Sequence, residues 1–158
     1  GAKGWNYEGG IRVPLIVHWP GRVKAGSTSQ AMVIGTDFYP TLLEMTGYPL
    51  LPHQHVDGQS FAPALLEQAH DRGAIFWHFP HYSNHGYQSP GGAIRLGDYK
   101  LLEYYENETV QLFNLKTDLG EQQDLSGLEP AIVEQLRSRL HAWRREVDAK
   151  MPTPKQGS

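Results

Sequence analysis

The chain opens with a glycine-rich loop that leads into an apolar run, and this pair of features restricts the fold more than any other part of the sequence. The run Val13–Trp19 is almost continuously apolar and stops at Pro20 and Gly21. Such a run predicts a strand that is buried on both faces, as strands are inside a parallel α/β sheet. The glycines of the preceding loop let the backbone approach a ligand closely.

Three charged residues of this opening loop have different expected roles. Lys3 offers a compact positive charge and is the candidate for contact with an anion. Glu8 and Arg12 are predicted to pair with each other and to orient the loop where it enters the apolar run, rather than to act in catalysis.

The following stretch predicts a second short strand and one helix. The strand is expected at Ala31–Ile34. The helix is expected to begin near Asp37, because aspartate is a good N-cap residue, and to end at Gly47, because glycine is favoured just after a helix. The region up to about Leu66 is therefore α/β in character.

The second half predicts a small antiparallel sheet packed by a C-terminal helix, so the whole chain is α+β with an α/β first part. Apolar residues recur at three- and four-residue steps, so a helix over about Pro130–Asp148 carries one apolar stripe, from Leu128 to Val147. We expect this stripe to cover one face of the sheet and to bury Leu136 and Trp143. Strands are predicted at Ala74–Phe79, Ala93–Leu96, Tyr99–Tyr105 and Val110–Asn114.

Composition excludes several classes of partner. The formal net charge of −3 gives no basic surface for nucleic acid. No apolar run reaches the roughly 18 residues of a membrane span, so no membrane partner is expected. The chain has no cysteine and therefore forms no disulfide.

A loop rich in histidine and tyrosine follows the first strand of the second half. His78, His81 and His85 are spaced by three and four residues, which on a helix would place three imidazoles together as zinc ligands. Pro80 disfavours a helix, and the loop holds neither cysteine nor carboxylate, so no metal site is predicted. The three histidines are either substrate contacts, as donors to sugar hydroxyls or an anionic group, or structural residues.

Five blocks of the sequence, in this order, resemble the sulfatase family over nearly the whole chain. The first block has Gly-x-Lys-Gly, an aromatic residue, Glu-Gly-Gly, x-Arg-x-Pro and Trp-Pro-Gly, at Gly1, Lys3, Gly4, Tyr7, Glu8, Gly9, Gly10, Arg12, Pro14, Trp19, Pro20 and Gly21. The other four blocks are Asp37–Gly47, Asp57–Leu66, Ala93–Leu101 and Leu112–Gln122. The chain thus resembles the C-terminal portion of a formylglycine-dependent sulfatase of the alkaline-phosphatase-like superfamily.

The resemblance implies hydrolysis of sulfate esters, with Lys3 contacting the sulfate group. It also implies calcium and a formylglycine, which is made from Cys or Ser within a Cys/Ser-x-Pro/Ala-x-Arg motif. This chain contains neither that motif nor the calcium ligands of the family. We therefore expect it to bind neither cofactor, to need the N-terminal catalytic part as its partner, and to be inactive alone.

The resemblance also implies a substrate, a location and a division into domains. The polar, aromatic loop Trp77–Tyr87 suits a sulfated carbohydrate better than an aryl sulfate. A periplasmic or secreted location is favoured by the family. Residues 1–68 would be the remnant of the sulfatase α/β sheet, residues 69–150 a subdomain of antiparallel sheet plus helix, and residues 151–158 a flexible tail. An unpaired strand Val13–Trp19 would favour self-association.

Two other functions fit the same sequence blocks. A phosphodiesterase or phosphonate hydrolase of the same superfamily shares the fold. The chain would otherwise be a non-catalytic module that binds a carbohydrate or a protein partner.

Overall fold

The computed structural model describes residues 3–84 and 88–153, and it divides them into two compact units. One unit joins residues 3–13 to residues 73–84 and 88–153, and the other comprises residues 14–72. The predicted antiparallel sheet with a C-terminal helix is present in the first unit, so the α+β fold class is confirmed. No helix within the described residues combines the length and the apolar character needed to cross a membrane.

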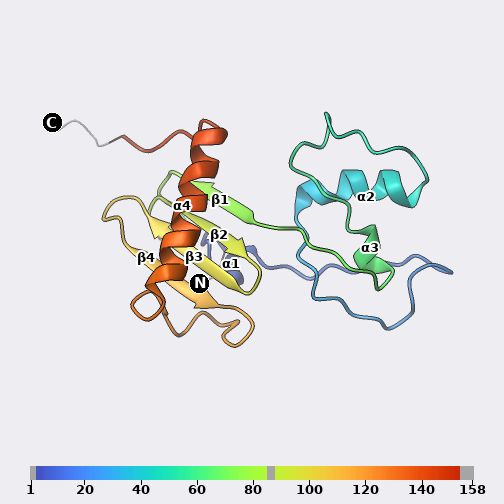
Figure 1. The fold of residues 1–158 in the computed structure, drawn as a ribbon, viewed down its shortest axis with the longest axis horizontal. Helices are drawn as coiled ribbons and strands as arrows, with labels where there is room; N and C mark the ends of the chain where they lie inside the picture. The colour runs from blue at the N-terminus through green and yellow to red at the C-terminus, as the bar shows by residue number, and fades with distance from the viewer. Residues whose placement is uncertain (1–2, 85–87, 154–158) are drawn as a thin grey trace. The chain divides into compact units, whose positions relative to one another are not determined.

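The sheet is a four-stranded antiparallel meander. Its strands are β1 (Ile75–Phe79), β2 (Gly91–Leu96), β3 (Tyr99–Tyr104) and β4 (Val110–Asn114), in the order β1-β2-β3-β4 (Figure 1). Gly97 and Asp98 connect β2 to β3, and Gly97 has a φ of 57°, which a tight hairpin turn of this kind requires. All four strands lie within two residues of the predicted bounds.

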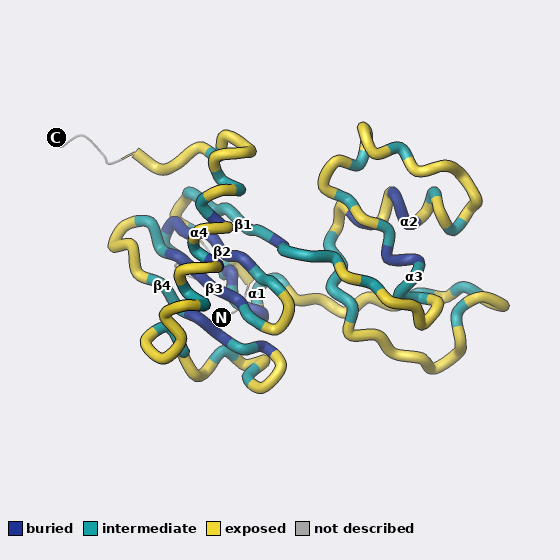
Figure 2. Tube along the Cα trace, in the orientation of Figure 1, coloured by how far each residue is buried: buried dark blue, intermediate teal, exposed yellow. Residues whose placement is uncertain are grey.

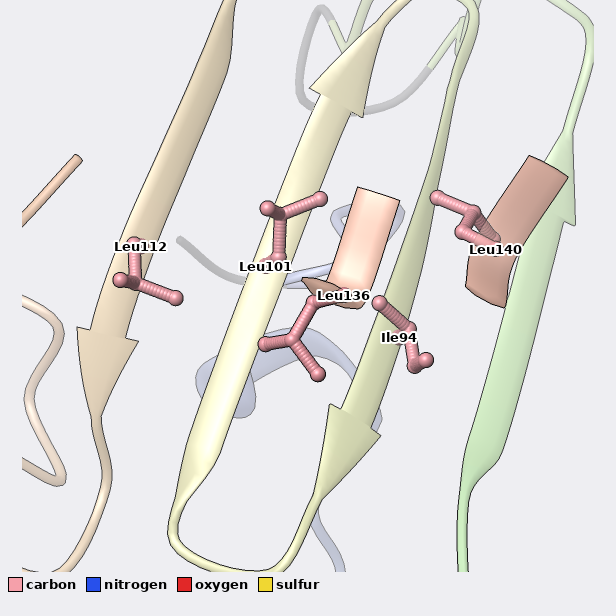
Figure 3. Close-up of a cluster of buried hydrophobic side chains, with 5 residues drawn as sticks. All are labelled: Ile94, Leu101, Leu112, Leu136 and Leu140. Atoms are coloured by element: carbon pink, nitrogen blue, oxygen red, sulfur yellow. The ribbon is translucent and has the colours of Figure 1, made fainter. Parts of the chain in front are cut away.

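Helix α4 (Pro130–Glu146) packs across one face of this sheet. The strands contribute Ile94, Leu101 and Leu112, which occupy paired positions on β2, β3 and β4, and α4 contributes Leu136 and Leu140 (Figure 3). All five side chains are buried, as predicted for Leu136.

The predicted stripe of α4 is only partly buried. Trp143 is half-buried, and its ring stacks on Phe76 of β1 at a centroid distance of 4.8 Å. Leu128 and Val147, at the two ends of the stripe, are exposed. Three turns of helix therefore suffice to cover the sheet.

The other face of the sheet is covered by the first residues of the chain. Side chains alternate along a strand, so Ala93, Leu102 and Phe113 point away from α4. They form a second apolar cluster, against which Tyr7 packs. Tyr7 directly precedes the short helix α1 (Glu8–Ile11). Figure 2 shows the buried positions concentrated along the strands.

The unit of residues 14–72 contains η1 (Gly35–Asp37), α2 (Phe38–Met45) and α3 (Ala62–Leu65). The predicted helix is confirmed, because α2 begins after Asp37 and ends before Gly47, whose φ is 76°. Asp37 stands at the N-cap position, but its side chain makes no capping hydrogen bond to α2 and bonds other segments instead. Its fully buried carboxylate accepts the backbone N–H of Gln59 at 2.9 Å and is 3.0 Å from Nε of Arg72.

The two strands predicted in this region do not form. Val13–Trp19 and Ala31–Ile34 lie in irregular structure, and Val13 and Ile16 are 79% and 90% exposed rather than buried. An apolar run becomes a strand only when another strand pairs with its N–H and C=O groups, and no described strand does so here. Pro14 also lacks an N–H to donate.

Candidate functional site

A dense network of polar contacts involves the opening segment, where it lies on the sheet face opposite α4. Lys100 of β3 is fully buried there, among the apolar side chains of that face. Its Nζ lies 3.0 Å from Oε1 of Glu8 and 2.9 Å from Oε1 of Glu121. The second oxygen of Glu121 accepts the backbone N–H of Glu8 at 2.6 Å. One ammonium group thus joins α1, β3 and the loop after β4.

Two guanidinium groups complete this ion cluster. Nη1 of Arg12 lies 2.9 Å from Oε2 of Glu8, and Nη1 of Arg95 lies 3.8 Å from the same oxygen. The predicted pair of Glu8 and Arg12 is therefore confirmed, between the first residue of α1 and the residue that follows its end. Burial alone would raise the pKa of Glu8, but the charge and hydrogen bond of Lys100, helped by both arginines, lower it below its usual value.

Aromatic and amide side chains hold the residues just before α1. Asn6 donates its backbone N–H to the side-chain carbonyl of Gln88, and the Tyr7 hydroxyl donates to the side-chain carbonyl of Gln111. The Tyr104 hydroxyl donates to the Tyr7 hydroxyl at 3.0 Å. Burial is the main cause that raises the pKa of Tyr104, so this phenol stays protonated and available as a donor. The segment Asn6–Arg12 is consequently anchored to β2, β3 and the residues around β4.

The predicted site residues lie in different places. Lys3 is exposed and precedes the anchored segment, separated from it by Trp5 and by Gly4, whose φ is 91°. His78 lies on the α4 face of β1, where Nδ1 is 2.7 Å from the Tyr105 hydroxyl and Nε2 is 2.9 Å from the Lys150 carbonyl oxygen. His81 is exposed and makes an edge-to-face contact with Phe79. His85 lies outside the described residues.

These positions do not bring Lys3 and His78 together, since the segment that carries Lys3 packs on the opposite face of the sheet from His78. Within residues 3–84 and 88–153, no three side chains of His, Cys, Asp or Glu gather as a metal ion would need.

Lys100 and Glu121 are functional candidates that reasoning about charge and spacing does not single out. Both residues stand inside blocks that resemble the sulfatase family, but the resemblance gave them no role. A local signal does exist for Lys100. Lys100 is two positions before Leu102 in β3, so both side chains lie on the same face of the sheet, and Lys100 pairs with Phe113 of β4. It therefore faces an apolar environment in which a lysine needs anionic partners.

A second buried carboxylate fixes α4 to the other face of the sheet. Glu103 of β3 accepts hydrogen bonds from Arg137 at 2.6 Å, from His141 at 2.8 Å and from Arg144 at 2.6 Å. The Arg144 guanidinium also lies 5.0 Å from the centroid of the Tyr105 ring. Burial would raise the pKa of Glu103, but these donors outweigh it and lower the pKa below its usual value.

Comparison with known proteins identifies the class of this fold. The family described as N-sulphoglucosamine sulphohydrolase, C-terminal, matches residues 2–146. The chain therefore belongs to that family and is a C-terminal portion of the sulfatase type.

Curated relatives carry sulfatase names. The chain is 36% identical to a sulfatase from Formosa agariphila, across 98% of this chain and 32% of the relative. It is 32% identical to an N-acetylglucosamine-6-O-sulfatase from Bacteroides thetaiotaomicron, across 80% of this chain and 24% of the relative. The chain thus spans a third or less of the length of these two relatives.

A solved structure shares the fold. It is a protein in complex with its substrate D-glucosamine-2-N,6-O-disulfate, and it matches 96% of this chain and 32% of its own chain. The TM-score is 0.76 and the sequence identity is 27%. Nearly the whole of this chain therefore has a counterpart in the fold of that protein.

Proposed function

We propose that this chain is the C-terminal part of a sulfatase that hydrolyses sulfate esters on a carbohydrate. The observation that carries the proposal is the match of the sulfatase C-terminal family to residues 2–146, which includes the segment with Lys3. A carbohydrate substrate is supported by one relative named for N-acetylglucosamine-6-O-sulfate chemistry and by a structural neighbour with a bound glucosamine disulfate.

Lys3 is proposed to contact the sulfate group. Its side chain is exposed, and its ammonium group would offset negative charge that develops on the ester oxygens during hydrolysis. Of the two described histidines, His81 is exposed and can reach a sugar hydroxyl, while His78 is already bonded to Tyr105 and Lys150. His85 is proposed as a further sugar contact, because it lies in the same loop of the sequence.

The nucleophile and the metal are proposed to come from the N-terminal catalytic part of the same enzyme. This chain contains no cysteine from which a formylglycine could be made. In this proposal, residues 1–68 are the end of the catalytic domain, residues 69–150 are the C-terminal subdomain, and calcium and formylglycine are held by the catalytic part. The isolated chain would then have no activity.

The test uses the complete sulfatase that contains this chain. Sulfate release is measured from 6-O-sulfated N-acetylglucosamine and from a chromogenic aryl sulfate, and release of the alcohol is measured from matched phosphodiester and phosphonate esters. The proposal expects turnover of the sulfated sugar at the highest kcat/KM. Preferential turnover of a phosphodiester or a phosphonate would overturn it, as would the absence of turnover on every sulfate ester.

A further inference from the structure

Lys100 occupies an environment that is unfavourable for a lysine unless its charge is fully compensated. Its side chain is completely buried between the sheet and the opening segment, and the Trp77 ring centroid lies 5.9 Å from Nζ. The two carboxylates that compensate the charge come from positions far apart in the sequence, 92 residues before it for Glu8 and 21 residues after it for Glu121. A single buried ammonium therefore determines where two distant segments lie.

The cluster fixes both the side chain and the backbone of Glu8. One oxygen of Glu8 accepts from Lys100 and the other from Arg12, while the backbone N–H of Glu8 donates to Glu121. Glu121 has a φ of 53°, in the left-handed region that residues other than glycine seldom adopt. The loop after β4 thus holds an unfavourable backbone conformation at the residue whose carboxylate reaches both Lys100 and Glu8.

Stability alone does not call for such a cluster. A well-packed set of apolar side chains generally stabilises a protein as much as a buried ion pair, or more. What charged and hydrogen-bonded partners add is directionality, because each bond is satisfied in only one arrangement. In this structure that arrangement places the start of α1 on the sheet, four residues beyond Gly4.

We propose that Lys100 is a positioning residue, which together with Glu121 holds Glu8 and α1 on the sheet and thereby sets the location of Lys3. This inference rests on the proposed function only in assigning Lys3 to the sulfate group. The placement of the segment Asn6–Arg12 by Lys100 is independent of the reaction and can be measured without substrate.

The first experiment measures amide hydrogen exchange in the full chain. Lys100→Met removes the charge and keeps most of the side-chain volume, and Glu121→Gln removes one carboxylate but keeps a carbonyl that can accept from Glu8. Either change should speed exchange at the amides of Glu8 and Arg12 by about tenfold or more, while exchange in α4 stays unchanged. Trypsin should also cleave faster after Arg12.

Two control variants separate positioning from general destabilisation. Lys116→Met removes an exposed lysine near β4 and should leave exchange unchanged everywhere. Leu136→Ala destabilises the opposite face and should speed exchange in α4 and in the strands together. Unchanged exchange over Asn6–Arg12 in both cluster variants, or a rise that runs parallel to α4 as in Leu136→Ala, would overturn the proposal.

The second experiment connects the cluster to Lys3 in the complete sulfatase. Lys100→Met should lower kcat/KM by about a hundredfold, as a small displacement of a reacting group does. If Lys100 acts through Lys3, the double variant with Lys3→Ala should be no slower than Lys3→Ala alone, whereas losses that add would contradict that route. If the unmodified enzyme turns over no sulfate ester, the proposed function is refuted. The hydrogen-exchange result would still test whether Lys100 positions the segment Asn6–Arg12.

Discussion

At the scale of single residues, the carboxylate of Glu8 links stability to pH. Its folded pKa lies below the usual value of 4.5, so the stabilisation it contributes is fully present above that pH. The contribution is lost as the pH falls through the folded pKa, because Glu8 must then be protonated and its pairs with Lys100 and Arg12 are broken.

We predict that Glu8→Gln costs about 3 kcal/mol at neutral pH, since it removes one partner of a buried ion pair. The difference in unfolding free energy between the unmodified chain and the variant should shrink as the pH is lowered below 4.5. Urea denaturation from pH 7 to pH 3 measures this difference. Because Glu103 titrates in both proteins, subtraction removes its effect, and a difference that stays constant with pH would contradict the assignment.

A second prediction at this scale concerns Lys3. Lys3→Ala in the complete sulfatase should lower kcat/KM by about 10²–10³-fold, the effect of removing one donor to a developing oxyanion. The same change should alter the stability of the chain by less than about 0.5 kcal/mol, because Lys3 is exposed. Lys24→Ala, at another exposed lysine, is the matched control. A loss of activity that is equal in both variants would mean that overall charge, not contact with the sulfate, is responsible.

At the scale of elements, α4 and the sheet depend on the buried part of the apolar stripe. Leu136 is 2% exposed and contacts the cluster of Ile94, Leu101 and Leu112, so Leu136→Ala should cost about 2–5 kcal/mol. Chemical denaturation followed by circular dichroism measures the change. Arg139→Ala, on the exposed side of the same helix, should cost less than about 0.5 kcal/mol. A cost for Leu136→Ala as small as that of Arg139→Ala would show that α4 does not pack on the sheet in this way.

The elements also show which structure the sequence can predict. The strands and α4 were predictable because alternation, the turn at Gly97 and the three- and four-residue spacing are local signals. The strand predicted at Val13–Trp19 was wrong, because the apolar character of a run does not show whether a partner strand is present. Only part of the ion cluster could be predicted from the sequence. The Glu8–Arg12 pair is local, whereas Lys100 and Glu8 are 92 positions apart in the sequence.

At the scale of the whole molecule, the chain matches a third or less of the length of the two curated relatives described above, and its two units differ in how well they are packed. The sheet is covered on both faces by α4 and by the opening segment. The unit of residues 14–72 instead exposes large apolar side chains, such as Ile16 and Val56.

The proposed need for a catalytic part predicts that the isolated chain is inactive. An assay of this chain on a chromogenic aryl sulfate should stay at background, and turnover by the pure chain would refute the proposal.

The exposed apolar run also predicts self-association of the isolated chain. Val13 and Ile16 are 79% and 90% exposed, and the run has no charged residue between Val13 and Val17. Extended backbone with unpaired N–H and C=O groups and exposed apolar side chains readily pairs with a second copy. In sedimentation over a concentration series, the average mass should rise with concentration. Ile16→Lys should suppress the rise, because a charge in the run opposes pairing, whereas Val56→Lys, at a similarly exposed position outside the run, should not. A strictly monomeric chain with slow amide exchange throughout Val13–Val17 would contradict the prediction, since the run would then be paired within the chain itself.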